Sequence, residues 1–140
     1  ESHRLKCISE MEKLKGCVID TARCDYNRYV QNLLNSKIVV SPWGLGEACH
    51  RDFEALYLGC VLLKPKTSHV MGAQDIYVNN KYYIECEVDF SDLQQKVDWI
   101  KDNWDSLTEM RVNGKRMLSE WWHIPKFTEH ITKQIKELVV

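Results

Sequence analysis

The stretch of residues 37–65 reads KIVVSPWGLGEACHRDFEALYLGCVLLKP and decides the fold that we expect. A β-branched apolar run at residues 38–40 predicts a strand, and a turn with two glycines follows it. A helical pattern then leads into a second apolar run, residues 60–63. This order predicts two parallel strands joined by a crossover helix. The glycine loop then lies at the carboxyl edge of the sheet, where α/β proteins bind ligands.

The helix expected between these strands carries an ionisable face. Counted from Glu47, residues at helical spacing on one side are Glu47, His50, Arg51 and Glu54. Residues roughly opposite, which we expect to pack on the sheet, are Cys49, Phe53, Leu56 and Tyr57. The amino end of the helix meets the glycine turn, and helix amino ends attract phosphate groups. The pattern alone leaves two interpretations open: an anion site, or a solvated face in which Glu47 and Arg51 form an ordinary ion pair.

Ordered sequence blocks carry a resemblance to a known family. They are SPWGLGE, RDFEA and LLKP within the first stretch, followed by DIY at residues 75–77 and DFSDL at residues 89–93. In this order they resemble the donor-binding half of two-domain glycosyltransferases of the GT-B type, in the group 1 or exostosin-like branch, over residues 26–105. The resemblance implies the carboxy-terminal nucleotide-sugar-binding domain: an α/β, Rossmann-like, doubly wound parallel sheet with carboxy-terminal helices, one half of a GT-B fold.

The resemblance also implies roles for the two glutamates. Glu47 is expected near the donor sugar, and Glu54 is expected to hold the ribose hydroxyls of the nucleotide. Chemistry adds Arg51, because a guanidinium stays charged and binds phosphate through two donors, and Lys64, which offers a point charge after the second strand. We therefore expect catalytic roles for Glu47 and Arg51. The expected donor-binding residues are Gly44, Gly46, Glu47, Arg51, Glu54 and Lys64.

Other polar and aromatic residues of the stretch have two interpretations. His50 and His69 contact donor oxygens or serve the structure, and Trp43 and Tyr57 line the nucleotide pocket or belong to the core. We expect no metal, because the Asp-x-Asp motif of metal-dependent sugar transferases is missing from the sequence. No cofactor is expected either, since the nucleoside-diphosphate sugar is itself the donor substrate.

The chain is shorter than a complete two-domain transferase, so a partner is implied. An amino-terminal acceptor-binding domain, or a separate partner chain, is expected to supply the acceptor. Two alternatives stay open. The chain is either one half of a split glycosyltransferase, or a non-catalytic Rossmann-like module that acts as an interaction or structural component.

Composition limits the class of protein. The chain has 140 residues, 44% hydrophobic and 28% charged, with a net charge of −1. This fits one domain, residues 1–140, whose helical carboxy-terminal extension covers residues 91–140. No basic block favours nucleic acid, and no apolar run is long enough for an integral membrane segment. The six cysteines lack the spacing of metal or disulfide frameworks, so we expect free thiols and a reducing, cytoplasmic location.

The remaining elements follow from periodicity and capping signals. We expect a surface helix over residues 2–14, a buried strand at 17–19, and a helix over 26–35 capped by Asp25. The residues 75–78 and 81–86 are expected to form either two short strands around the turn dipeptide Asn79-Asn80 or one irregular edge segment. Three further helices are expected to begin near residues 91, 106 and 125, with Gly114 weakening or bending the second of these. The apolar residues expected on the first two are Leu93, Val97, Ile100 and Trp104, and then Met110, Met117 and Leu118.

Overall fold

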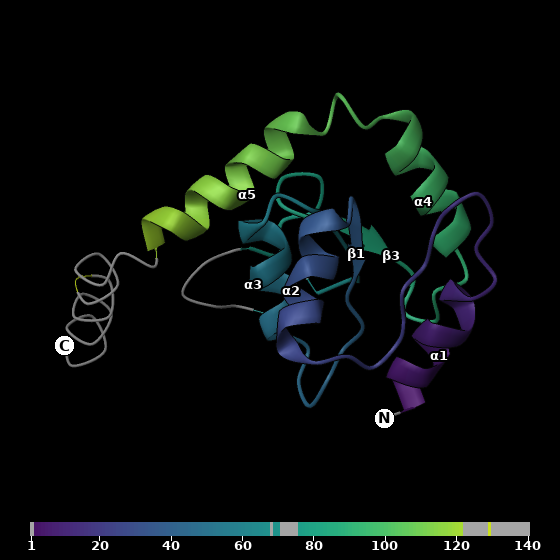
Figure 1. Ribbon diagram of the computed structural model, residues 1–140. Coiled ribbons are helices and arrows are strands. Elements are labelled where there is room, and N and C mark those ends of the chain that lie inside the picture. Colours follow the sequence, from purple (N-terminus) through teal and green to yellow (C-terminus); the bar gives the residue numbers. More distant parts are fainter. Residues whose placement is uncertain (1, 68, 71–75, 122–128, 130–140) are drawn as a thin grey trace.

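The computed structural model describes residues 2–67, 69–70, 76–121 and 129. Figure 1 shows the short strands at the centre with helices around them. The elements are α1 (Ser2–Met11), α2 (Tyr26–Asn35), β1 (Ile38–Val40), α3 (His50–Tyr57), β2 (Val61–Pro65), β3 (Ile84–Cys86), α4 (Leu93–Asp102) and α5 (Thr108–Trp121).

The three strands form one parallel sheet in the order β1-β2-β3. Val40 pairs with Leu63, and Leu63 in turn pairs with Ile84, so β2 is the central strand. Every residue of β2 is buried, as a central parallel strand with a continuous apolar sequence requires. The predicted strand–helix–strand unit is thereby confirmed.

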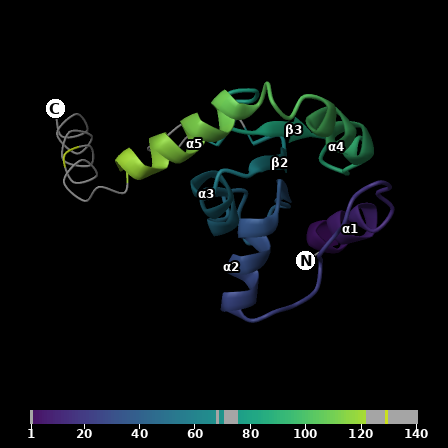
Figure 2. The same cartoon turned by 45° about the horizontal axis from the view of Figure 1, so that its top comes forward.

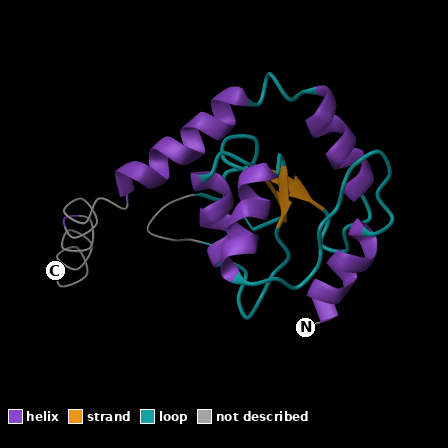
Figure 3. Ribbon diagram, viewed as in Figure 1, coloured by secondary structure: helices purple, strands orange, loops and turns teal. Residues whose placement is uncertain are grey.

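Alternate residues of β2 face two separate cores. Val61 and Leu63 pack with Cys7 of α1 and with the apolar side of α4. Leu62 packs with Leu33 of α2 and with α3. Figures 2 and 3 show these helices on the two sides of the sheet. The structure is therefore an α/β fold with a parallel sheet covered on both faces, compatible with a Rossmann-like arrangement, although three strands are fewer than a doubly wound GT-B half contains.

The strand predicted at residues 17–19 is wrong. Cys17 and Val18 are exposed, Val18 completely so, and the segment belongs to an irregular connection between α1 and α2. Among the described residues β1 pairs with β2 alone, so this apolar run has no strand beside it. A run of three residues without a pairing partner buries too little surface to form a strand.

The predicted helices agree better with the structure. Asp25 caps α2 by accepting from the backbone N–H of Arg28 at 3.0 Å, as expected. Leu93, Val97 and Ile100 of α4 are buried, also as expected. Helix α5 carries the predicted pair Met110 and Leu118 into the interior. The last predicted helix, from residue 125, lies outside the described residues.

The segment between β2 and α4 does not form the two short strands, and it is closer to the irregular alternative. Residues 76–78 form no strand, and the second predicted strand is shortened to β3 with an isolated bridge between Asn79 and Tyr83. Asn80 adopts a positive φ of 61°, as the turn dipeptide indicated. Phe90 also has a positive φ, 60°, although its side chain is 1% exposed. Asp75 lies outside the described residues.

Gly114 allows two helices to approach closely. It is buried within α5, and a Cβ added there would lie 3.2 Å from Cδ2 of Leu56 on α3. Helix α5 continues through this glycine from Thr108 to Trp121, so its role is close packing against α3.

Candidate functional site

The loop of residues 41–49 leaves β1 at the carboxyl edge of the sheet. Ser41 and Pro42 are buried, whereas Gly44, Leu45 and Gly46 are exposed. The backbone N–H of Gly44 donates to the carbonyl of Gly46 at 2.9 Å, which closes the tip of the loop. Neither glycine has a positive φ, and a Cβ at Gly46 would meet no atom within 4 Å. The protein's own packing therefore does not require glycine at 46, and the tip has open space in front of it.

Glu47 belongs to this loop and not to the helix. Helix α3 begins at His50 with Cys49 as its capping residue, so the helix counted from Glu47 begins too early in our prediction. The carboxylate of Glu47 lies 2.7 Å from Nε2 of His69, in the segment after β2. Both side chains are partly open to solvent. The pair joins two loops that leave neighbouring strands at the same edge of the sheet.

The side of α3 that faces the sheet also differs from the prediction. The buried residues of α3 are Asp52, Ala55 and Leu56, whereas Phe53 is half-buried and Tyr57 is 40% exposed. The buried side of α3 is shifted by about one residue from the side that we expected. An aspartate therefore lies against the sheet.

Asp52 is the centre of a buried polar network. One carboxylate oxygen, Oδ1, accepts from the hydroxyl of Ser41. The other, Oδ2, accepts from the backbone N–H of Cys49 at 3.0 Å and from the hydroxyl of Tyr77 at 2.7 Å. Oδ2 also lies 3.2 Å from Nζ of Lys64. These contacts fix the end of β1, the start of α3 and the centre of β2 to one another.

Lys64 has a different place from the one predicted. Its side chain is completely buried, and its ammonium pairs with Asp52 and lies 3.4 Å from the carbonyl of Ser41. A direct phosphate contact from Lys64 would require the loss of these bonds and the opening of the core. We therefore do not assign Lys64 to a ligand. The sequence did hold a signal for the buried position of Asp52. The apolar run VLLKP contains a lysine, and a buried charge needs a partner of opposite charge.

Arg51 and Glu54 lie together on the half-buried side of α3. Glu54 accepts from the hydroxyl of Tyr29 on α2 at 2.6 Å. Burial raises the pKa of Tyr29 above its ordinary value, and the bond to Glu54 adds to the rise. The guanidinium of Arg51 lowers the pKa of Tyr29 in part, through its charge and a hydrogen bond, so Arg51 lies beside the same hydroxyl. Its charge also lowers the pKa of Cys7 on α1, against the larger rise that burial causes.

The remaining candidate residues differ in how far they are exposed to solvent. Trp43 is half-buried and stacks on His3 of α1 at 4.9 Å between ring centroids, so it holds α1 and does not project into solvent. His50 is exposed at the first turn of α3. The six cysteines, all within the described part of the chain, are free thiols as predicted. Cys17 and Cys24 are exposed, however, and only Cys7, Cys60 and Cys86 are buried.

The geometry brings together part of the predicted set. Arg51 and Glu54 share one side of α3, while Glu47, Gly44 and Gly46 occupy the loop at its amino end. A guanidinium, a carboxylate and an exposed glycine loop at the edge of a parallel sheet are suited to an anionic ligand that also carries hydroxyl groups.

Comparison with family models, curated proteins and solved structures finds no match for this chain. Its function must therefore be inferred from the residues themselves. In the part of the chain that the structure describes, no helix combines the length and apolarity needed to cross a membrane. Within the same residues, no three side chains of His, Cys, Asp or Glu gather as metal ligands would.

Proposed function

We propose that this chain is the donor-binding domain of a glycosyltransferase. It binds a nucleoside-diphosphate sugar at the carboxyl edge of the sheet for transfer to an acceptor hydroxyl. One observation carries the proposal: Arg51 and Glu54, both on the helix α3 that follows the glycine loop of β1, lie beside the hydroxyl of Tyr29 on α2. This is the place where parallel α/β sheets bind nucleotides.

Each residue has a role that its chemistry supports. Arg51 binds the diphosphate and stabilises the negative charge that grows as the bond from the sugar to the phosphate oxygen breaks. Glu54 accepts hydrogen bonds from the ribose hydroxyls, and Tyr29 orients its carboxylate. Glu47, held by His69, lies on the loop nearest the transferred sugar in this arrangement. The new bond forms from the acceptor oxygen to the sugar carbon, and the hydroxyl proton leaves to a base in the acceptor-binding domain or partner chain.

The glycine loop supports the same proposal. Gly44 and Gly46 are exposed and need no special backbone conformation, and the space before Gly46 is open. A glycine that the protein's own packing does not require is suited to the close approach of a ligand to the backbone. Residues with side chains at these positions would narrow the approach to the amino end of α3.

A different observation favours a second function, that of a non-catalytic interaction module. The two candidate carboxylates are already engaged within the protein, Glu54 by Tyr29 and Glu47 by His69. If these pairs serve only to fasten α2 and the loops, the chain keeps its fold without binding a nucleotide.

Calorimetric titration separates the two functions. We expect saturable binding of a uridine or guanosine diphosphate sugar, and a loss of at least ten-fold in affinity for Glu54→Ala and Arg51→Ala, since each removes a charge-assisted contact. Matched controls are Glu109→Ala and Arg116→Ala, which change exposed residues of α5. If no nucleotide sugar binds to the folded chain, the interaction module is the correct function. If one binds, addition of an acceptor-binding chain and measurement of released diphosphate tests transfer.

A further inference from the structure

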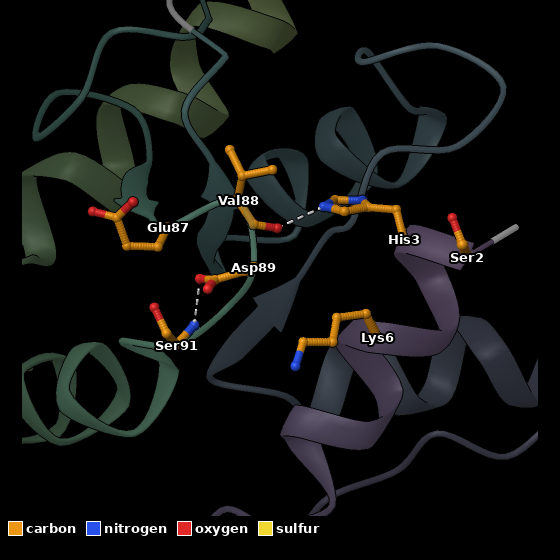
Figure 4. Close-up of a pocket in the computed structure, with 7 residues that line it drawn as sticks. All are labelled: Ser2, His3, Lys6, Glu87, Val88, Asp89 and Ser91. Atoms are coloured by element: carbon orange, nitrogen blue, oxygen red, sulfur yellow. Dashed lines mark hydrogen bonds between the residues drawn. The ribbon is translucent and has the colours of Figure 1, made fainter.

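A pocket of about 550 Å³, open to solvent and lined mostly by exposed side chains, lies between α1 and the turn that follows β3. Its lining residues are Ser2, His3, Lys6, Glu87, Val88, Asp89 and Ser91. Figure 4 shows that Ser2, His3 and Lys6 come from one wall, α1, and the other four from the opposite wall. The volume falls within the range of small-molecule sites. None of these residues belongs to the candidate site on α3.

His3 connects α1 to the turn at the back of the pocket. The backbone N–H of Trp43 donates to Nδ1 of His3 at 3.2 Å, so the ring proton is on Nε2, which donates to the carbonyl of Val88 at 2.9 Å. The ring also stacks on Trp43 and lies 4.9 Å from the ring of Phe90. The bond from Nε2 joins α1 to the turn, and the bond at Nδ1 fixes the orientation of the ring. The pocket is formed before any ligand arrives.

The two walls carry opposite charges. Lys6 reaches from α1 towards the turn, and its ammonium is bonded to Glu10 at 2.6 Å. Asp89 faces it from the turn, where it accepts from the backbone N–H of Ser91 at 3.0 Å. In the described structure Lys6 pairs with Glu10 and makes no ion pair with Asp89. An ammonium has three donors and a carboxylate accepts several bonds, so both groups keep capacity for a ligand.

The charges of Lys6 and Asp89 influence each other's pKa across the pocket. The bond to Glu10 raises the pKa of Lys6, and the charge of Asp89 across the pocket adds a smaller rise. The hydrogen bonds from Ser91 lower the pKa of Asp89, and the charge of Lys6 lowers it further. Both groups are therefore charged at neutral pH. They act on each other across the pocket without a direct bond.

We propose that this pocket binds a small zwitterion of the α-amino-acid type. The carboxylate of the ligand bonds to Lys6, and its ammonium bonds to Asp89, while the hydroxyls of Ser2 and Ser91 and the apolar side chain of Val88 contact the rest of the molecule. Two opposite charges that face each other across a gap are complementary to a ligand bearing both charges. A ligand with one charge satisfies only one wall and leaves the other uncompensated. This binding is independent of the proposed transferase function.

Three related probes test the proposal on the full ¹⁵N-labelled chain by nuclear magnetic resonance. L-alanine carries both charges, L-alaninamide lacks the carboxylate, and N-acetyl-L-alanine lacks the ammonium. We expect L-alanine to give saturable shifts at residues 2–6 and 87–91 with a dissociation constant in the range of about 1–10 mM, as suits so small a ligand. Each single-charge probe should bind about ten-fold more weakly, because it loses one charge-assisted contact.

Variants assign the contacts. Lys6→Met and Asp89→Asn should each weaken L-alanine binding about ten-fold, and the amide oxygen introduced by Asp89→Asn can still accept from the backbone N–H of Ser91, so the turn is retained. Lys13→Met is the matched control for the first, because Lys13 bonds the same Glu10 but does not line the pocket. Asp102→Asn, at an exposed position on α4, is the control for the second.

Three results would overturn the proposal. One is no saturable shift at these residues with 50 mM L-alanine, which is about five times the upper end of the expected range of dissociation constants. A second is equal binding of all three probes. The third is unchanged binding in a folded Lys6→Met chain. If Asp89→Asn does not fold, Ser91→Ala is measured in its place, and unchanged affinity there together with unchanged affinity in Lys6→Met also contradicts the proposal.

Discussion

Nζ of Lys64 lies 3.2 Å from Oδ2 of Asp52, and both side chains are completely buried. The pair connects the central strand β2 to the first turn of α3, directly below the loop that carries Gly44 and Gly46. A buried ion pair costs much desolvation, and this one has further donors around Asp52 that offset the cost. The geometry at the carboxyl edge of the sheet therefore depends on two charges that no ligand touches.

Breaking this pair is expected to destabilise the chain strongly. Lys64→Met leaves a buried carboxylate without its cation, which we expect to lower the free energy of unfolding by about 3–5 kcal/mol. The double variant Asp52→Asn with Lys64→Met removes both charges and should cost less than the sum of the two single variants. Urea denaturation measures all three, with Lys66→Met, an exposed neighbour, as the control. Additivity of the single effects within about 0.5 kcal/mol would show that the two residues do not interact.

The contact of Gly114 with Leu56 predicts that a larger residue at position 114 does not fit between α3 and α5. Gly114→Leu places several carbon atoms where a Cβ is already 3.2 Å from Leu56, so we expect a loss of about 1–3 kcal/mol in the free energy of unfolding. Lys115→Leu puts the same side chain at an exposed position of the same helix and should change stability little. Thermal unfolding of both variants gives the comparison, and equal midpoints would contradict close packing at Gly114.

Thiol reactivity should divide the cysteines into two groups. Burial raises the pKa of Cys7 and of Cys60 to about 11, and it also raises that of Cys86. These thiols are therefore protonated and inaccessible at neutral pH, and should react with a chromogenic disulfide reagent only on unfolding. Cys17 and Cys24 are exposed and should react first.

The serine double variant at Cys17 and Cys24 should lose the fast phase of this reaction. Cys49 is half-buried and is still present in the double variant, where it should react at an intermediate rate. Reaction of more than this one thiol before unfolding would mean that the core around Cys7 and Cys86 opens readily in the folded state.

Alkaline pH should destabilise the fold through its buried phenols. The pKa values of Tyr29, Tyr77 and Tyr83 are raised above the ordinary 10.0, in each case chiefly by burial. The folded chain holds these protons more tightly than the unfolded chain, so their stabilising contribution is complete below pH 10 and is lost as the pH rises above it. Denaturation midpoints measured between pH 8 and about 11.5 should fall in the upper part of that range.

The absorbance of the phenolate shows which tyrosines cause this loss of stability. Tyr77→Phe should remove one late-ionising group from the spectrophotometric titration. If all tyrosines ionise near pH 10 while the chain is still folded, the burial of these three hydroxyls is wrong.

The sequence indicated much of the fold because its strongest signals are local. The apolar runs of β1 and β2, the cap of α2 at Asp25 and the spacing of Leu93, Val97 and Ile100 each follow from neighbouring residues. The segment at Val18 has the same apolar composition but no strand beside it. Pairing is a property of the assembled sheet, so composition alone could not exclude a strand there.

The candidate site was also predicted only in part. The sequence placed Arg51 and Glu54 on one side of a helix, and the structure agrees. It also placed Glu47 on that helix, because periodic spacing extends smoothly across a capping residue, and the start at His50 depends on how Asp52 bonds to Cys49. The buried role of Lys64 depends on contacts among three separate elements, which spacing along the chain does not reveal.

The backbone of Phe90 has consequences for motion at the edge of the sheet. A left-handed conformation is costly for a residue with a bulky side chain, and here the buried ring, packed near His3, holds it in place. The turn from Glu87 to Ser91 is then not an independent flap, since it relaxes only if the ring leaves the interior. Amide hydrogen exchange in this turn should be slow, with rates close to those of β3 and α4. Exchange at this exposed turn then measures the unfolding of the whole domain.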